Sequence, residues 1–139
     1  MTVQAYAQPV LFEDFELGSL MGEHSETYAP AQAQRWQAIF GNTAAAGADG
    51  LAEKASMAVV MMMRAYLNIV APRPPGNIHA GQKLELHRMP HPGETVRTAV
   101  RCVAKSMRRE RRYIELRVEG CGDDDRPIFA GDLTLIWAA

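Results

Sequence analysis

The sequence has few of the residues that form disulfides and metal sites. Only two of its 139 residues are cysteines, Cys102 and Cys121, and neither belongs to a CxxC pair or to a Cys/His cluster with metal-ligand spacing. His24, His87 and His91 are scattered along the chain without a spacing such as HxxxH. We therefore predict a reduced protein with two buried or half-buried thiols and no bound metal.

Strong net charge and long apolar runs are also absent. The formal net charge is −1, which gives no sign of a nucleic-acid or acidic-membrane partner. Residues 1–18 contain neither the basic start nor the apolar stretch of a secretory signal. No run reaches the roughly 20 apolar residues that span a bilayer. We expect a cytoplasmic protein that binds neither nucleic acid nor a membrane.

The chain does have two helical patterns, and its length fits one domain over residues 1–139. Residues 30–41 begin with a proline and end with a glycine, which suit the first turn and the stop of a helix. Their apolar residues lie on one face: Ala33, Trp36, Ile39 and Phe40. Residues 51–70 carry apolar residues on nearly every face, including a run of three methionines, before Pro72 stops the helix. Such a helix is buried on most sides.

Beyond residue 76 the hydrophobic pattern changes to alternation, which is typical of strands. We expect strands over residues 82–88, 95–103, 113–120 and 128–138, and a shorter one over residues 24–28. In the strand expected over residues 113–120, Ile114, Leu116 and Val118 lie on one face, and charged residues lie on the other. Short turns separate the last four strands, so they form an antiparallel meander.

One buried helix followed by an antiparallel meander favours an α+β domain in which a curved sheet wraps around a long central helix. This is the hotdog architecture. Hotdog domains usually pair, because a single copy leaves a sheet edge and part of the helix groove open. The methionines at positions 57, 61, 62 and 63 agree with a surface that a partner or an acyl chain covers.

Two stretches carry a family resemblance. Residues 12–22, FEDFELGSLMG, resemble the opening of MaoC-like dehydratases, and residues 76–96, GNIHAGQKLELHRMPHPGETV, resemble the strand and turn after that family's central helix. The LELHR form is similar to the N-terminal half of the double-hotdog members, which lacks the catalytic pair. The resemblance covers residues 12–137 and implies (R)-specific enoyl-CoA hydratase or dehydratase chemistry on an acyl thioester.

The resemblance also implies a catalytic dyad, and the matching loop lacks it. Family members hold an Asp and a His a few residues apart after the first helix, one to activate water and one to protonate carbon. Here that loop reads GNTAAAGADG, with Asn42 in place of the Asp and no His before the next helix. An amide side chain cannot act as a general base at neutral pH.

Other polar residues are candidates for the missing roles. Asp49 and Glu53 flank the start of the central helix, where related thioesterases and dehydratases place a catalytic carboxylate; the alternative is that they cap and stabilise the helix. The loop and Gly50 leave a free helix N-terminus that a thioester oxygen could approach. His79 is a substitute acid/base or a loop histidine without a catalytic role.

Further residues are candidates for binding. The resemblance places Asn77 and Gln82 with His79 in a stretch that lines the acyl-thioester pocket, and Asn42 and Gly50 are candidates in the small-residue loop. Arg108 and Arg109 lie in an arginine-rich bend that could meet the phosphates of coenzyme A or the acidic face of an acyl carrier protein; a solvated surface is the alternative.

Two classes of function remain open. In one, the chain is an acyl-thioester enzyme, either a hydratase with a rearranged dyad or a thioesterase that uses Glu53 or Asp49. In the other, which the missing dyad favours, it is a non-catalytic subunit. We expect it to bind acyl-CoA or acyl-carrier-protein thioesters without a separate cofactor. Its expected partner is a second copy or a dyad-bearing hotdog chain.

Overall fold

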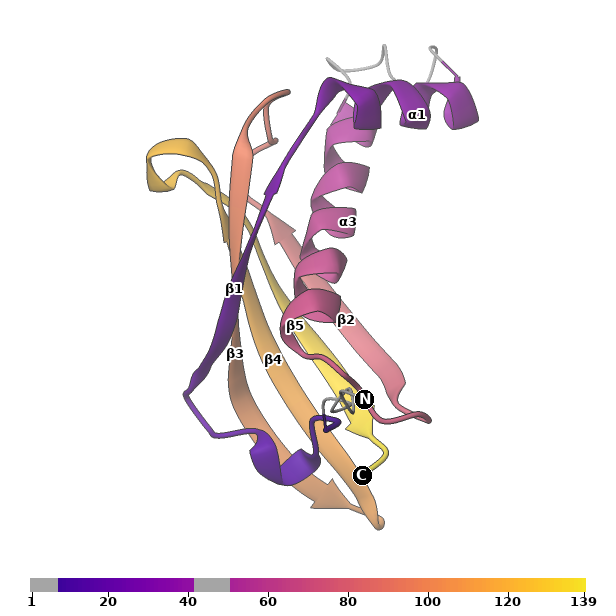
Figure 1. The fold of residues 1–139 in the computed structure, drawn as a ribbon, viewed down its shortest axis with the longest axis vertical. Coiled ribbons are helices and arrows are strands. Elements are labelled where there is room, and N and C mark those ends of the chain that lie inside the picture. The colour runs from indigo at the N-terminus through magenta and orange to yellow at the C-terminus, as the bar shows by residue number, and fades with distance from the viewer. Residues whose placement is uncertain (1–7, 42–50) are drawn as a thin grey trace, which may run out of the picture.

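The structure is a computed structural model that describes residues 8–41 and 51–139. Asn42, Asp49 and Gly50 therefore lie outside the described residues. Five strands form one antiparallel sheet in the order β1-β3-β4-β5-β2 (Figure 1). Their bounds are β1 Leu20–Thr27, β2 Ile78–Leu86, β3 Thr95–Arg108, β4 Arg111–Cys121 and β5 Pro127–Trp137. The expected strands are confirmed, but β1 and β2 each begin earlier than predicted, β2 ends at Leu86 instead of residue 88, and β3 extends to Arg108.

Two α-helices lie between β1 and β2 in the chain. Helix α1, Pro30–Phe40, crosses one end of the molecule, and α3, Leu51–Ile69, lies along the concave face of the sheet (Figure 1). Short 3-10 turns occur at Phe12–Asp14 and Asp123–Asp125. A curved antiparallel sheet around a long central helix is the hotdog arrangement that the sequence predicts.

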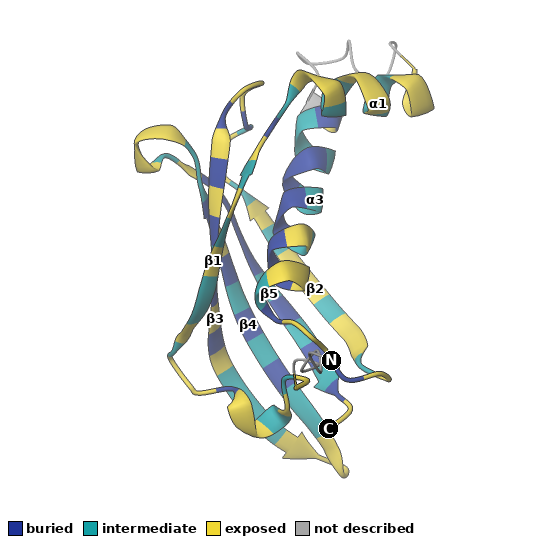
Figure 2. Ribbon diagram, viewed as in Figure 1, coloured by how far each residue is buried: buried dark blue, intermediate teal, exposed yellow. Residues whose placement is uncertain are grey.

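Alternation along the strands places one face of the sheet in the core (Figure 2). Ile114, Leu116 and Val118 are fully buried, whereas their outward-facing neighbours in β4 are partly exposed. On α3, Ala58, Met62 and Ala65 are also fully buried. Burial of apolar area at about 25 cal/mol per Å² is therefore the main force holding α3 on the sheet.

Two glycines allow neighbouring elements to pack closely in the core. A Cβ at Gly131 would lie 2.9 Å from both the Met62 sulfur and the Lys83 carbonyl oxygen, so glycine allows α3 and β2 to approach β5. A Cβ at Gly120 would lie 2.4 Å from a ring atom of Phe129, the residue opposite it in β5. The Phe129 ring thus covers the space left by the missing side chain.

A buried carboxylate joins two turns at one end of the sheet. Glu94 is 2% exposed, forms an ion pair with Arg126, and accepts hydrogen bonds from the backbone N–H groups of His91 (2.9 Å) and Asp123 (3.0 Å). Burial by itself raises the pKa of Glu94, but the Arg126 guanidinium and the two N–H groups outweigh it and hold that pKa below the usual glutamate range.

Cys102 is buried and Cys121 is half-buried, and no disulfide joins them. In the part of the chain that the structure describes, no helix has the length and hydrophobicity to cross a bilayer. The same residues contain no group of three or more His, Cys, Asp or Glu side chains placed to hold a metal ion, and the absence of a metal stays a prediction.

Candidate functional site

An open hollow of about 170 Å³ lies between the two α-helices. Helix spacing explains its walls, because residues three and four apart share a face. One face of α1 and one face of α3 supply the lining: Gln32, Arg35, Trp36 and Ile39 from the first, and Met57, Val60 and Arg64 from the second. Most of the wall is apolar, with two arginines at its edge, so the hollow suits an apolar group attached to a polar or anionic one.

Glu53 lies one helical turn before Met57 on the same face of α3. Its side chain is buried, and its two oxygens accept hydrogen bonds from the Tyr28 hydroxyl (2.7 Å) and the Gln37 amide (3.2 Å). Burial, together with the adjacent Glu53 carboxylate, raises the pKa of Tyr28 far above its ordinary value, so this hydroxyl stays a donor. Glu53 thus ties β1, α1 and α3 together, and its catalytic role stays a prediction.

A second carboxylate, Glu26 of β1, contacts two of the residues that line the hollow. Glu26 accepts a hydrogen bond from the Gln32 amide (3.1 Å) and forms an ion pair with Arg64, and both of these partners line the hollow. Gln32 is held in turn because its amide oxygen accepts from the Ala29 backbone N–H (3.0 Å). The second oxygen of Glu26 is buried without a hydrogen-bond partner among the described residues.

Trp36 supplies an unpartnered donor in the wall itself. Its indole N–H is buried and has no acceptor among the described residues. Buried polar atoms are nearly always satisfied by protein or water, so the second Glu26 oxygen and the Trp36 N–H are exceptions among the described residues. Both atoms are inaccessible to solvent, so the exposed wall of the hollow is defined by its apolar side chains and its arginines.

Sequence reasoning did not identify Glu26, Tyr28 or Trp36 as site residues. Trp36 was counted only as part of the apolar face of its helix, and Glu26 fell within a short predicted strand. Glu26 and Arg64 are 38 positions apart, and no local pattern connects them. The unusual mixture of glutamines with a tryptophan on α1 is the one signal that could have indicated a binding face.

The structure separates the other described candidate residues from this hollow. His79 and Gln82 both lie in β2, which begins at Ile78, so His79 belongs to a strand and not to a loop, and Gln82 lies in a strand as predicted. His79 is exposed and pairs with Leu135 at the end of the sheet remote from α1 (Figure 1). Asn77 lies beside it, and its amide oxygen accepts from the Ala138 N–H (2.7 Å). These residues and Glu53 do not come together within one chain.

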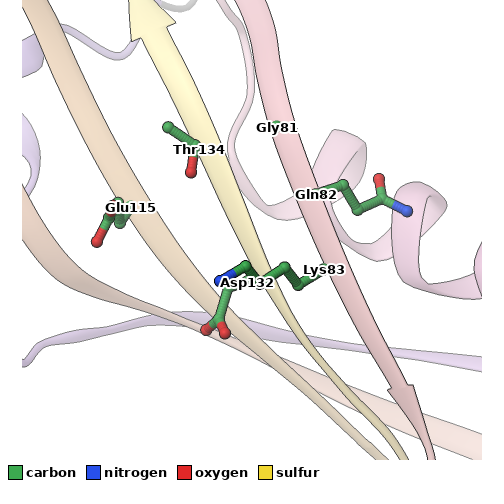
Figure 3. Close-up of a pocket in the computed structure, with 6 residues that line it drawn as sticks. All are labelled: Gly81, Gln82, Lys83, Glu115, Asp132 and Thr134. Carbon is green, nitrogen blue, oxygen red and sulfur yellow. The ribbon is translucent and has the colours of Figure 1, made fainter.

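Gln82 borders a different hollow, of about 360 Å³, on the sheet. The lining residues come from neighbouring strands: Gly81, Gln82, Lys83, Glu115, Asp132 and Thr134 (Figure 3). Asp132 accepts from the Arg117 guanidinium at 3.2 Å through both of its oxygens. A face of mixed, partly paired charges is typical of a solvated sheet surface, and we assign no chemistry to it.

Arg108 and Arg109 lie at the β3–β4 hairpin, at the far end of the sheet from α1 (Figure 1). Arg108 is held in place, because its guanidinium lies 4.7 Å from the Tyr113 ring centroid and donates to the Ser106 hydroxyl (3.2 Å). Neither arginine borders the hollow between the helices.

Neither a family model nor a curated protein matches this sequence significantly. Solved structures match its fold. The MaoC-like dehydratase from Rhodospirillum rubrum has a TM-score of 0.75 at 15% sequence identity, over 94% of this chain and 98% of that one. A mutant of the fluoroacetyl-CoA-specific thioesterase FlK has a TM-score of 0.66 at 17% identity, over 88% of this chain and 87% of that one.

A chain of the ChsH1-ChsH2 complex from Mycobacterium tuberculosis is also similar, with a TM-score of 0.66 at 13% identity, over 88% of this chain and 98% of that one. At these identities the likeness concerns the fold, and it confirms the hotdog prediction. It also places a dehydratase, a thioesterase and a two-component complex on the same backbone arrangement.

Proposed function

We propose that this chain is a MaoC-like hotdog protein that binds acyl thioesters, carried on coenzyme A or an acyl carrier protein, as a dyad-lacking subunit of a hydratase or dehydratase. The observation that carries the proposal is the hollow between α1 and α3, with its mainly apolar wall and two arginines among its lining residues. The fold shared with the MaoC-like dehydratase supports it.

In this proposal the chain contributes binding and orientation. Ile39, Met57 and Val60 line the hollow and contact the acyl chain. Glu53, Tyr28 and Gln37 hold the two helices in the arrangement that forms the hollow.

The chain supplies no pair of acid and base at the expected position, because residues 41–50 contain no histidine and Asn42 replaces the Asp. The proton transfers are therefore assigned to a second hotdog chain that carries the dyad. A chain of the ChsH1-ChsH2 complex has a similar fold, which supports a role for this chain within a two-component assembly.

A direct test is the affinity for crotonyl-CoA and hexanoyl-CoA, measured by isothermal titration calorimetry on the full chain. Val60→Gln places an amide against the acyl chain, and burying an unpaired amide costs about 1–3 kcal/mol, or roughly 5- to 150-fold in affinity. Leu67→Gln is the matched control, because Leu67 lies on the same helix, is 42% exposed and does not line the hollow. Equal losses in the two variants would show that the hollow is not the acyl site.

The division of labour has its own test, the hydration of crotonyl-CoA followed by loss of enoyl absorbance. The chain alone is expected to hydrate slowly, and addition of a dyad-bearing hotdog chain encoded beside it is expected to restore turnover. Fast hydration by the chain alone would contradict the non-catalytic role.

A second candidate function is an acyl-CoA thioesterase that uses a carboxylate at the start of the central helix, either Glu53 or Asp49. The buried Glu53 beside the hollow and the fold shared with FlK favour it. Release of free coenzyme A thiol from hexanoyl-CoA, lost in Glu53→Gln while the melting temperature is retained, would support this function over the first. No thiol release from the native chain would exclude it for that substrate.

A further inference from the structure

The β3–β4 hairpin concentrates positive charge. Four arginines and one glutamate occupy positions 108–112, so this short segment carries a net charge of +3 within a chain whose overall charge is −1. The pairing of Arg108 with Arg111 leaves only Arg109 and Glu110 in the loop. All four guanidinium groups are therefore held within a two-residue hairpin and the strand ends beside it.

The arginines of the hairpin have no acidic partner among the described residues, whereas three arginines elsewhere do. Arg97 pairs with Asp125 (2.7 Å), Arg117 with Asp132 (3.2 Å), and Arg126 with Glu94. By contrast, no carboxylate of the described residues forms an ion pair with an arginine of the hairpin. Repulsion between like charges opposes the folding of this segment, and a bound anion would remove that repulsion.

The hairpin also forms a concave surface. Arg108, Arg109, Arg111 and Tyr113 line an open hollow of about 610 Å³. The Tyr113 ring and the Ser106 hydroxyl hold the Arg108 guanidinium, so part of its side-chain entropy is lost before any ligand binds. Three planar guanidinium groups around one hollow match the geometry of phosphate oxygens, which arginine binds in a bidentate manner.

Backbone conformation supports a role for the charge at position 109. Arg109 (φ 50°) and Glu110 (φ 65°) both adopt the left-handed conformation, as a two-residue type I′ turn requires. Asn-Gly suits such a turn, whereas arginine and glutamate are strained there. A strained residue at a loop tip is a reason to look for function.

The hairpin is distant from the hollow between the helices. The Thr95 end of β3 lies near α1, since Thr27 pairs with Thr95 and α1 follows at Pro30. The other end of β3 is Arg108, about 40 Å away at roughly 3.3 Å per residue along the strand. Figure 1 shows the same separation. The two hollows of one chain are therefore separate sites.

We propose that the β3–β4 hairpin is a binding site for a small molecule that carries two or more phosphate groups, separate from the acyl hollow of the same chain. Arg108 and Arg111 on the two strands contact one phosphate from either side. Arg109 at the loop tip reaches a second. This site goes beyond the proposed function and does not depend on it.

The test is calorimetric titration of the full chain with inorganic pyrophosphate and with adenosine 3′,5′-bisphosphate in 0.15 M salt. Both probes lack an acyl group, so neither reports on the hollow between the helices. Arg108→Gln/Arg111→Gln is expected to weaken binding by at least about 30-fold, the effect of losing two charge-assisted hydrogen bonds. Arg88→Gln/Arg101→Gln is the matched control, since it removes the same charge from exposed positions away from the hairpin and is expected to change binding less than about threefold.

A lysine pair separates guanidinium geometry from charge. Arg108→Lys/Arg111→Lys keeps both charges but loses bidentate bonding, so binding is expected to fall between the native protein and the glutamine variant. The proposal is overturned if neither probe binds, or if the control variant loses as much affinity as the hairpin variant. Val60→Gln is expected to leave the binding of both probes unchanged, so the proposal for the hairpin site is tested independently of the proposal for the acyl site.

Discussion

The ion pair of Glu94 and Arg126 gives a sharp test of how the two turns at one end of the sheet are held. Glu94→Gln keeps the size of the side chain and removes its charge. The new amide N–H₂ must face at least one group that now donates to Glu94: the Arg126 guanidinium, or the N–H of His91 or Asp123. The substitution therefore replaces a buried carboxylate that accepts from these donors with an amide whose own N–H₂ group faces one of them.

The expected loss of unfolding free energy at pH 7 is about 2–4 kcal/mol. Breaking a buried ion pair by removing one partner typically costs about 3–5 kcal/mol. The Arg126 side chain is 21% exposed, so water can hydrate it in part, which places the estimate somewhat lower. Relaxation around the amide is limited, because a Cβ at Gly122 would lie only 2.1 Å from a Glu94 oxygen.

The same pair predicts a dependence on pH. The pKa of Glu94 is lower in the folded protein than in the unfolded chain, where a glutamate has a pKa of about 4.3. A lowered pKa stabilises the fold fully above the unfolded value, and the stabilisation disappears as the pH falls through the folded value. The stability gap between the native protein and Glu94→Gln is therefore expected to be constant near pH 7 and to narrow below about pH 4.3.

Urea unfolding at pH 7, 5, 4 and 3, followed by circular dichroism, measures this gap. Glu85→Gln is the control, because Glu85 is exposed in β2, and its effect is expected to stay within about 0.5 kcal/mol. A gap below 1 kcal/mol at pH 7 would refute the energetic role of the pair. A gap that is the same at pH 3 and pH 7 would refute its electrostatic origin.

Two further predictions concern backbone positions where glycine is favoured. Gly120→Ala is expected to lower the unfolding free energy by about 1–3 kcal/mol, because the new methyl group would overlap the Phe129 ring. Gly81→Ala is the control, since a Cβ there would lie 3.7 Å from its nearest neighbour and is expected to have little effect in the same urea assay. Arg109→Asn/Glu110→Gly leaves the net charge unchanged and relieves two strained positive φ angles. It is expected to raise the unfolding free energy by about 1–2 kcal/mol. An unchanged midpoint in thermal melting would argue against strain in the turn.

Much of the fold follows from patterns that act over short distances. The alternation in residues 113–120 correctly gave the buried face of β4, because the inward side chains of a strand repeat every second residue. The central helix was equally clear, since a helix with apolar residues on most faces must be buried on most sides. The extension of β3 to Arg108 was not predicted, because its last residues carry charge on both faces and depend on pairing with β4.

The candidate site was much less predictable. The hollow needs α1 to cross α3, and that crossing depends on Tyr28 and Gln37 meeting Glu53, contacts that no local pattern in the sequence indicates. The family resemblance directed attention to His79 and Gln82, which the structure places in β2 and away from the hollow. Asn42, Asp49 and Gly50 lie outside the described residues, so their roles stay predictions.

The geometry of Glu53 bears on the choice between the two candidate functions. A general base needs a lone pair directed at its substrate and a way to lose its proton again. The Glu53 oxygens already accept hydrogen bonds from the Tyr28 hydroxyl and the Gln37 amide, which belong to the segments that Glu53 holds together. This favours a structural role for Glu53 and, with it, a chain that binds the thioester while a partner performs the proton transfers.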